Sequence, residues 1–161
     1  MTLDYSTPGE VKIDMVDCVK EMIKDFPIDL GGKVATVANE HLFDTSKGKT
    51  LGPMKSEAFH AIVAKALFLT FRSRPDIRLA TAFLCARVKQ PTTYDWFKLH
   101  RMMNFLRRTR DECLTLRLDG TWKTKWSIDA ACAVHPDEIS TCSHAEGHQC
   151  YPTAVFLGCR H

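Results

Sequence analysis

The most basic stretch of the sequence, residues 95–110, holds the side chains best suited to bind a polyanion. Lys98, Arg101 and Arg108 lie on one side of a predicted helix, opposite its apolar stripe, and Arg107 lies beside them. Such a face can follow the phosphates of a nucleic acid in a salt-dependent way. The alternative is a solvated helix surface whose end cations interact with the helix dipole. Composition alone favours this second interpretation.

Asp129 is the acidic residue whose position is most suited to metal chemistry, because it lies at the end of a predicted strand. Nucleases of the two-metal type place a carboxylate there, and several acids together hold two divalent ions about 3.5–4 Å apart. One carboxylate cannot hold such a pair. On its own, Asp129 is typical of an aspartate at a strand end or turn.

The last part of the chain is rich in side chains that bind zinc. The spacing of one residue between Cys and His partners is awkward for a tetrahedral site, so the alternative is an unstructured tail with chance thiols. The seven cysteines of the chain form an odd number, which argues against a closed disulfide framework. The candidate ligands are Cys142, His144, His148, Cys150, Cys159 and His161.

Two other patterns point to chemistry only weakly. Gly48-Lys49-Thr50 is similar to the end of a phosphate-binding loop, but that loop needs an earlier glycine where this chain has Phe43. A cysteine nucleophile would need a base and an electropositive pocket, and no local pattern identifies either. Cys18 and Cys85 fall on apolar helix faces and are typical of small core residues.

Composition predicts one ordinary globular domain. The chain has 161 residues, of which 45% are hydrophobic and 25% charged, which is far from the composition of disordered proteins. No apolar run reaches the length of about 18 residues that a membrane span needs, so no membrane contact is expected. The N-terminus lacks the basic flank and apolar block of a signal peptide, so the expectation is an intracellular protein that is not secreted.

The elements that must position these residues follow from periodicity and turn signals. Residues 1–13 alternate around a Thr7-Pro8-Gly9 turn and predict a β-hairpin. Asp14 can cap a helix that Pro27 ends. Residues 28–54 show weak periodicity and several glycines, which predicts a long surface loop.

Three further helices are predicted along the middle of the chain. They cover residues 56–71, residues 76–88 after a Ser73-Arg74-Pro75-Asp76 cap, and a stretch that opens at Pro91 and Thr92 or Thr93. The last of these carries its core-facing stripe at Trp96, Leu99, Met103 and Leu106. The chain therefore has about four helices.

After Arg110 the apolar period changes to that of a strand. Residues 114–118 and 122–128 alternate on either side of Asp119-Gly120, which predicts a second β-hairpin. Residues 138–161 show no period and predict an irregular or disordered tail. The predicted fold class is α+β, with a hairpin, a helical region and the beginning of a second sheet.

The order of several motifs in residues 68–116 resembles copia-type LTR retrotransposon Pol polyproteins, just after the reverse transcriptase palm. The steps are Arg74-Pro75-Asp76-Ile77, Pro91-Thr92, Trp96 and a basic helix end that reads RMMNFLRRT over 101–109. Residues 1–26 resemble the hairpin and helix that leave the palm. Residues 127–137 resemble the opening of the family's RNase H domain.

The resemblance implies a division of the chain into three parts. Residues 1–112 would be a thumb or connection region of the reverse transcriptase, 113–137 the truncated start of an RNase H-like domain, and 138–161 a divergent Cys/His-rich tail. Asp129 would be the first carboxylate of the Mg²⁺ site, although the family's second acid in that step is Ala131 here. Lys98, Arg101, Arg107 and Arg108 would contact nucleic acid.

The resemblance also implies an activity that this chain alone should lack. The family carries out RNA-directed DNA synthesis and removes the RNA strand of the hybrid, in a cytoplasmic particle or the nucleus, using Mg²⁺. This sequence contains no Asp-Asp pair for the polymerase metals, so its expected partner is a missing palm, and it should bind no metal cofactor. The competing hypothesis is a stand-alone small helical nucleic-acid-binding protein, with zinc stabilising its tail.

Overall fold

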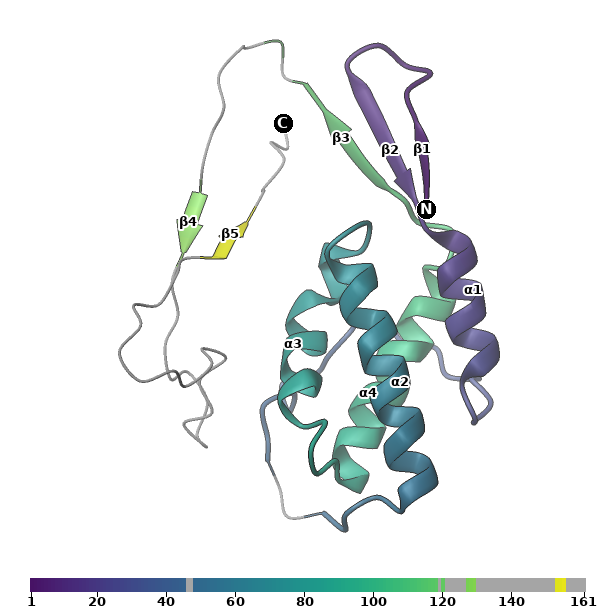
Figure 1. Ribbon diagram of the computed structural model, residues 1–161, viewed down its shortest axis with the longest axis vertical. Helices are drawn as coiled ribbons and strands as arrows, with labels where there is room; N and C mark the ends of the chain where they lie inside the picture. The colour runs from purple at the N-terminus through teal and green to yellow at the C-terminus, as the bar shows by residue number, and fades with distance from the viewer. Residues whose placement is uncertain (46–47, 119, 121–126, 130–152, 156–161) are drawn as a thin grey trace.

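The computed structural model describes residues 1–45, 48–118, 120, 127–129 and 153–155. In this part of the chain, four α-helices pack into one unit and a three-stranded antiparallel sheet stands at one end of it (Figure 1). The predicted α+β class is confirmed at this level. The relation of the later strands to an RNase H sheet stays a prediction.

The N-terminal hairpin forms as predicted. β1 (Thr2–Asp4) pairs antiparallel with β2 (Glu10–Asp14). The turn between them closes through a hydrogen bond of 3.1 Å from the Glu10 amide to the Thr7 carbonyl. Gly9 takes a φ of +77°, which side chains with a Cβ rarely adopt, so a glycine is needed here.

A third strand, which follows the four helices in the sequence, completes this sheet. β3 (Leu114–Arg117) pairs antiparallel with β2, with Leu114 opposite Ile13 and Leu116 opposite Val11. Sequence analysis did not predict this pairing, because the Asp119-Gly120 signal reports only on the local turn. Gly120 does take a φ of +74°. Of the expected partner strand 122–128, residues 122–126 lie outside the described residues, and Ser127 and Ile128 belong to a strand that pairs with residues 153–155 instead.

The last two strands form a separate pair. β4 (Ser127–Asp129) pairs antiparallel with β5 (Thr153–Val155), and Asp129 lies opposite Thr153. The tail 138–161 was predicted to be irregular, so β5 is a regular element that the absence of a period did not indicate. The rest of the tail lies outside the described residues.

One face of the three-stranded sheet is apolar and partly open to solvent. Directly paired residues share a face, so Leu3, Ile13 and Leu114 form one row and Val11 and Leu116 the next. Leu3 and Leu116 are each 42% exposed. Leu3 and Leu116 are therefore open to solvent, whereas Val11, Ile13 and Leu114 are partly buried.

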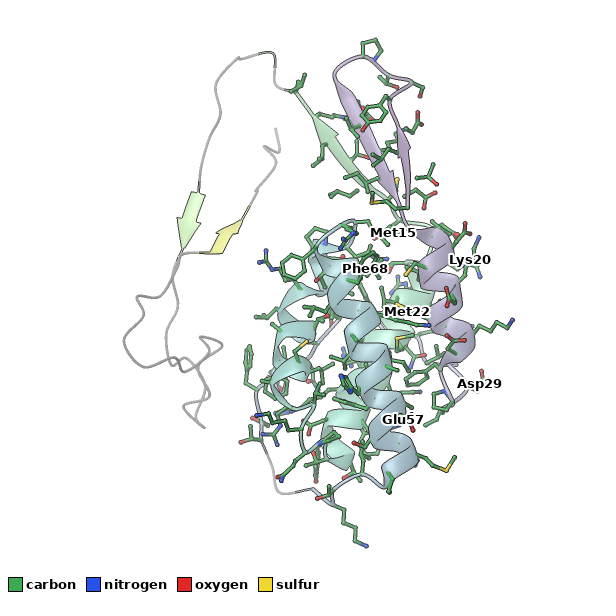
Figure 2. The ribbon with its side chains drawn as sticks, in the orientation of Figure 1. Met15, Lys20, Met22, Asp29, Glu57 and Phe68 are labelled. Atoms are coloured by element: carbon green, nitrogen blue, oxygen red, sulfur yellow. The ribbon has the colours of Figure 1, made fainter. Side chains whose placement is uncertain are left out.

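α1 (Val16–Asp25) begins directly after β2 and ends before Pro27, as predicted. The Asp14 carboxylate accepts a hydrogen bond of 2.6 Å from the Val16 amide, but Met15 occupies the N-cap position, so the expected cap acts from within the strand. Figure 2 shows Met22 between α1 and α2 and Lys20 on the outer side of α1. The burial of Met22 and the exposure of Lys20 agree with the spacing of apolar residues in this helix.

The next three helices also match their expected places. α2 (Pro53–Thr70) begins three residues earlier than predicted, because Pro53 is well suited to the first turn of a helix. A short 3₁₀ turn, η1 (Pro75–Ile77), leads into α3 (Arg78–Ala86). α4 (Thr93–Arg108) follows and packs against the other three helices. No helix in the described ranges is long and apolar enough to cross a membrane.

The core lies where α4 meets α1, α2 and α3. The predicted stripe of α4, Trp96, Leu99, Met103 and Leu106, is buried throughout. Phe26 of the α1 end stacks on Trp96 with ring centroids 5.5 Å apart. The opposite face of α4 is therefore left for the loop between α1 and α2.

Candidate nucleic-acid interface

The register of α4 is set at its first turn by a capping box. The Thr92 amide donates to Asp95 Oδ2 at 2.8 Å, and the Asp95 amide donates to Thr92 Oγ1 at 3.4 Å. Asp95 is buried, and its Oδ2 lies 3.5 Å from Nε of Arg87. The helix therefore starts at a defined residue, which fixes the direction in which each later cation points.

Three of the four predicted cations hold the loop between α1 and α2 along one side of α4. Lys98 Nζ donates to the Asp44 carbonyl. Arg101 Nη2 donates to Thr36 Oγ1 at 2.9 Å, and Arg108 Nη1 donates to the Val34 carbonyl at 3.3 Å. The structure thus brings these three cations together on one face, with part of their hydrogen-bonding capacity used by the chain itself.

Lys98 is partly buried, and its surroundings affect its charge. Burial lowers the pKa of its ammonium, and the nearby Asp95 and Asp44 carboxylates oppose that effect. Its Nζ also lies 4.4 Å from the centroid of the Phe83 ring, which stabilises the cation through the ring quadrupole. Lys98 is therefore held in place as well as charged.

Arg107 lies apart from the other three cations. It is exposed and lines a cavity of about 510 Å³ formed with the end of α1 and the chain that follows it. The prediction placed Arg107 beside Lys98 and Arg101, but the helix turns it toward residues 23–30 instead. A ligand on the Lys98 side would not reach Arg107 at the same time unless it wrapped around the helix.

A groove of about 440 Å³ opens between the loop and the first half of α4. Tyr94 and Phe97 line it and are 50% and 67% exposed, next to the predicted Lys98 and Arg101. The loop side is formed by Asn39, His41 and Asp44. Sequence reasoning missed both aromatic residues, although two aromatics on the polar side of a helix, beside two cations, are a readable signal.

Two polar contacts fix the loop at other points. Asn104 is buried on α4; its Oδ1 accepts from the Gly32 amide at 3.1 Å, and its Nδ2 donates to the His100 carbonyl at 3.0 Å. Asn104 was also missed; an amide among the apolar positions of a helix is the signal that finds it. At the far end of the loop, the Thr93 amide donates to the Lys49 carbonyl at 2.9 Å.

Gly48-Lys49-Thr50 makes this second attachment rather than a phosphate loop. Thr50 forms an isolated bridge with Thr92, and the Leu51 amide donates to the Pro91 carbonyl at 2.9 Å. A Cβ on Gly48 would lie 2.6 Å from Cδ2 of Tyr94, so the glycine permits the close approach. The backbone here serves to dock the loop on the start of α4.

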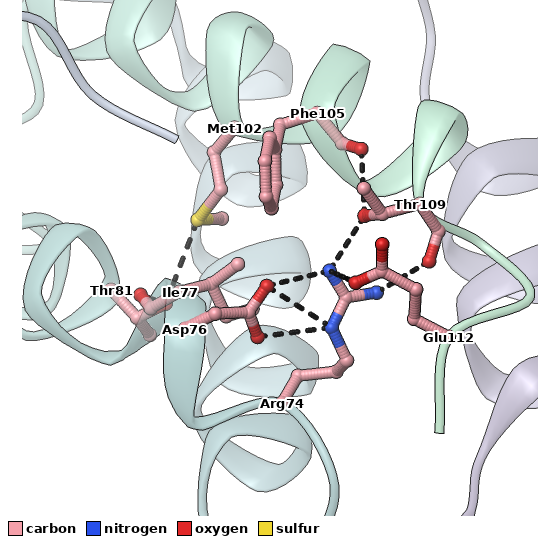
Figure 3. Close-up of polar contacts among 8 residues, drawn as sticks. All are labelled: Arg74, Asp76, Ile77, Thr81, Met102, Phe105, Thr109 and Glu112. Carbon is pink, nitrogen blue, oxygen red and sulfur yellow. Dashed lines mark hydrogen bonds and ion pairs between the residues drawn. The ribbon is translucent and has the colours of Figure 1, made fainter. Parts of the chain in front are cut away.

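The Arg74-Pro75-Asp76-Ile77 step forms a structural joint (Figure 3). Arg74 is buried, and its guanidinium donates to Asp76 Oδ2 from Nη2 at 2.7 Å and to Oδ1 from Nε at 3.0 Å. It also donates to the Thr109 carbonyl at 2.8 Å and to Thr109 Oγ1 at 2.6 Å. The end of α4 is thereby tied to the start of η1, and a guanidinium at a helix C-terminus is favourable to the helix dipole.

Asp129 is the last residue of β4, so it lies at the strand end where it was predicted. Its role as a metal ligand stays a prediction. In the ranges that the structure describes, no group of three or more His, Cys, Asp or Glu is placed to hold a metal ion. The candidate zinc ligands between Cys142 and His161 lie outside those ranges. Both metal hypotheses therefore stay predictions.

The described cysteines are free thiols with different surroundings. Cys18 and Cys85 are partly buried and Cys113 is exposed. Burial raises the pKa of Cys18 and of Cys85, which is the opposite of what activates a cysteine nucleophile. Their position agrees with a role in packing.

Comparison with known proteins identifies no matching family, no similar curated sequence and no similar solved structure.

Proposed function

We propose that the chain is part of a copia-type retrotransposon Pol polyprotein, with residues 1–112 as a thumb or connection region and 113–137 as the start of an RNase H-like domain. The proposal rests on the order of motifs, and three of the four motifs include a junction of the fold, whereas Trp96 lies within α4. Arg74-Pro75 opens η1, Thr92 caps α4, and residues 107–109 end α4. For these three motifs, the resemblance therefore follows the positions where the chain changes element.

In this proposal the chain is a scaffold that contacts the phosphates of nucleic acid without catalysing a reaction. The observation that carries it is the groove in which Lys98 and Arg101 lie beside the exposed rings of Tyr94 and Phe97. Cations next to exposed aromatic rings are typical of surfaces that bind nucleic acid without sequence preference. Arg108 extends the charge of this face toward the end of α4, whereas Arg107 lies on another side of the helix.

Catalysis would depend on carboxylates that this sequence does not contain. The sequence has no Asp-Asp pair, and Ala131 stands where the family has a second acid. In the family, Mg²⁺ ions bound by several acids activate the attacking group. Asp129 alone would leave such a site incomplete, so the function proposed for this chain is binding.

The contact with nucleic acid should be weak, because the chain already uses several of its donors. The Asp44 and Val34 carbonyls accept from Lys98 and Arg108, so a phosphate must compete with the loop for these cations. Binding that depends on phosphate neutralisation falls steeply with salt, with a slope of about 0.9 per phosphate on a logarithmic scale. A measurable affinity is expected only at low ionic strength.

The test is fluorescence anisotropy of a labelled RNA/DNA hybrid titrated with the whole chain at several salt concentrations. A variant with Lys98, Arg101, Arg107 and Arg108 all changed to Gln keeps polar side chains but removes four charges. The matched control changes four exposed lysines elsewhere to Gln: Lys20, Lys24, Lys55 and Lys89. Circular dichroism and thermal melting establish that both variants fold.

We expect the α4 variant to lose affinity and to show a shallower salt dependence than the control. Equal affinity and equal slope in both variants would contradict the proposal. Tight binding by the wild type at physiological salt, together with a melting temperature that falls on adding a chelator, would instead favour the stand-alone zinc-stabilised binder.

A further inference from the structure

The groove between the loop and α4 has the features of a site for a flat, anionic ligand. Its α4 side presents Tyr94, Phe97, Lys98 and Arg101; Phe97 and Lys98 lie three and four residues after Tyr94, and four and three residues before Arg101. Aromatic surface and positive charge therefore lie on one helix face, within reach of one small molecule or one residue of a polymer.

Both rings are at least half exposed, although one edge of Tyr94 packs against Gly48. Tyr94 is 50% and Phe97 is 67% exposed, although both lie in the first turns of a helix whose other side is fully buried. A single exposed aromatic residue is common on protein surfaces, but two that line one groove beside two cations are not a scattered pair. Their faces are available for stacking against a planar group.

Arg101 supplies positive charge at one wall of the groove. Its Nη2 donates to Thr36 Oγ1 at 2.9 Å and its Nε is buried, so a ligand in the groove would meet the outer end of the guanidinium. Asp44 stands on the other wall and is held by His41 Nδ1 at 3.0 Å from its Oδ2. An anionic group would therefore be favoured on the Arg101 side and disfavoured near Asp44.

The volume of the groove selects the size of the ligand. About 440 Å³ lies within the range of small-molecule sites and is suited to a single nucleotide. The bases of a duplex are stacked on their neighbours, so their faces are not free to meet Tyr94 or Phe97. A base must be unpaired and unstacked to use these rings.

We infer that this groove binds one unpaired nucleotide of a single strand, with the base against Phe97 and Tyr94 and its phosphate near Arg101. The inference rests on the proposed function, since it names the form of nucleic acid that the same surface prefers. It adds a preference for single-stranded over duplex nucleic acid, which the basic residues alone cannot give. Phosphate contacts carry no such selectivity, whereas stacking requires a free base.

The test compares a short labelled single-stranded oligonucleotide with a hybrid duplex of the same length, by anisotropy at low salt. The variants are Phe97→Ala, Tyr94→Ala and Phe97→Trp, and Phe71→Ala is the control because Phe71 is an exposed ring on another helix end. Loss of one stacking ring should weaken single-strand binding by about 5- to 100-fold and leave duplex binding within twofold. Phe97→Trp should retain single-strand binding.

Two results separate the inference from the function on which it depends. If the wild type binds oligonucleotides but Phe97→Ala and Phe71→Ala behave alike, the groove proposal is overturned while the proposed function stands. If the wild type binds neither oligonucleotide at low salt, both are overturned. As a second measurement, a strand carrying 5-iodouracil should crosslink on irradiation to the peptide that contains Tyr94 or Phe97; an adduct confined to other peptides overturns the inference.

Discussion

The guanidinium of Arg74 binds both the carbonyl and the hydroxyl of Thr109, at 2.8 and 2.6 Å, across 35 positions of the chain. This contact joins the end of α4 to the start of η1, and Asp76 occupies the other edge of the same guanidinium. Arginine fits this place because its planar group can serve two acceptors on different edges at once. The Arg74-Pro75-Asp76-Ile77 step, which carries part of the resemblance, therefore has a structural role in this fold.

Arg74→Ala should lower the free energy of unfolding by about 2–4 kcal/mol, because it removes a buried side chain and leaves several part-buried acceptors without their charged donor. Arg74→Lys should recover only part of this loss, since an ammonium cannot bond Asp76 and Thr109 in the same geometry. Urea unfolding followed by circular dichroism measures both. Arg72→Ala is the control: Arg72 is exposed, two residues away, and lies over the Phe68 ring at 3.7 Å, so its loss should change stability by no more than about 1 kcal/mol. Similar losses at Arg72 and Arg74 would contradict this account.

Gly48→Ala should detach the second half of the loop from α4. The new Cβ would lie 2.6 Å from Cδ2 of Tyr94 and 2.9 Å from Oγ1 of Thr93, so backbone or ring must shift. The expected loss is about 1–3 kcal/mol in the free energy of unfolding, measured by urea titration. Gly31→Ala is the matched control in the same loop, because nothing lies within 4 Å of its Cβ. The account fails if the two alanines have the same effect.

Lys65 joins α2 to α1 by a contact whose strength depends on pH. Its Nζ lies 2.7 Å from Asp25 Oδ2 and 3.2 Å from Glu21 Oε1, and donation to Asp25, then to Glu21, raises the pKa of Lys65 above its ordinary value of 10.5. A raised pKa means that the stabilisation is fully present below pH 10.5 and is lost as pH rises through the raised value.

Lys65→Met should therefore reduce the free energy of unfolding by up to about 1 kcal/mol at neutral pH, as for other exposed ion pairs. The difference from the wild type should shrink as the pH is raised above 10.5. Urea unfolding at several pH values checks this, with Lys55→Met, an exposed lysine in the first turn of the same helix, as the control. A difference that stays constant with pH would argue against the ion pair.

Cys18 and Cys85 should react slowly with iodoacetamide near pH 9. Burial raises the pKa of each thiol above its ordinary value of 9.0, so less thiolate is present at that pH. Rates are followed by mass spectrometry of individual peptides, with the exposed Cys113 as the reference. The rates of Cys18 and Cys85 should continue to rise at pH values above 9. A midpoint below that value for either residue would indicate an activated nucleophile.

The elements that depend on local patterns were predictable from the sequence. The hairpin followed from alternation around Pro8 and Gly9, and the helices followed from apolar spacing with proline at their borders. The pairing of β3 with β2 was not predictable in the same way, because strand pairing over a long separation leaves no local mark. The alternation of apolar residues predicts that Leu114 lies in a strand, but it does not predict that Ile13 is its partner in the sheet.

The sequence predicted which charged residues share the candidate site, but it did not predict the loop that lies against them. Lys98, Arg101 and Arg108 share one face of α4, as helical spacing requires, but the loop that covers them makes contacts through backbone carbonyls, which every residue has. Helical periodicity did not predict the surroundings of Arg107. Its neighbour Arg108 faces the loop, whereas Arg107 points toward Ile23 and the end of α1. Only the positions of neighbouring elements decide which exposed cation meets which partner.

The sheet that closes the fold joins Glu10 to Arg117, whose side chains meet at 2.7 Å across 107 positions. During synthesis, β2 therefore leaves the ribosome long before its second partner exists. Until β3 emerges, one edge of β2 carries unsatisfied backbone groups with Val11 and Ile13 beside them, which is the kind of segment that pairs with other chains. A chaperone that binds this edge of β2 would therefore protect the chain from such pairing until β3 has been made.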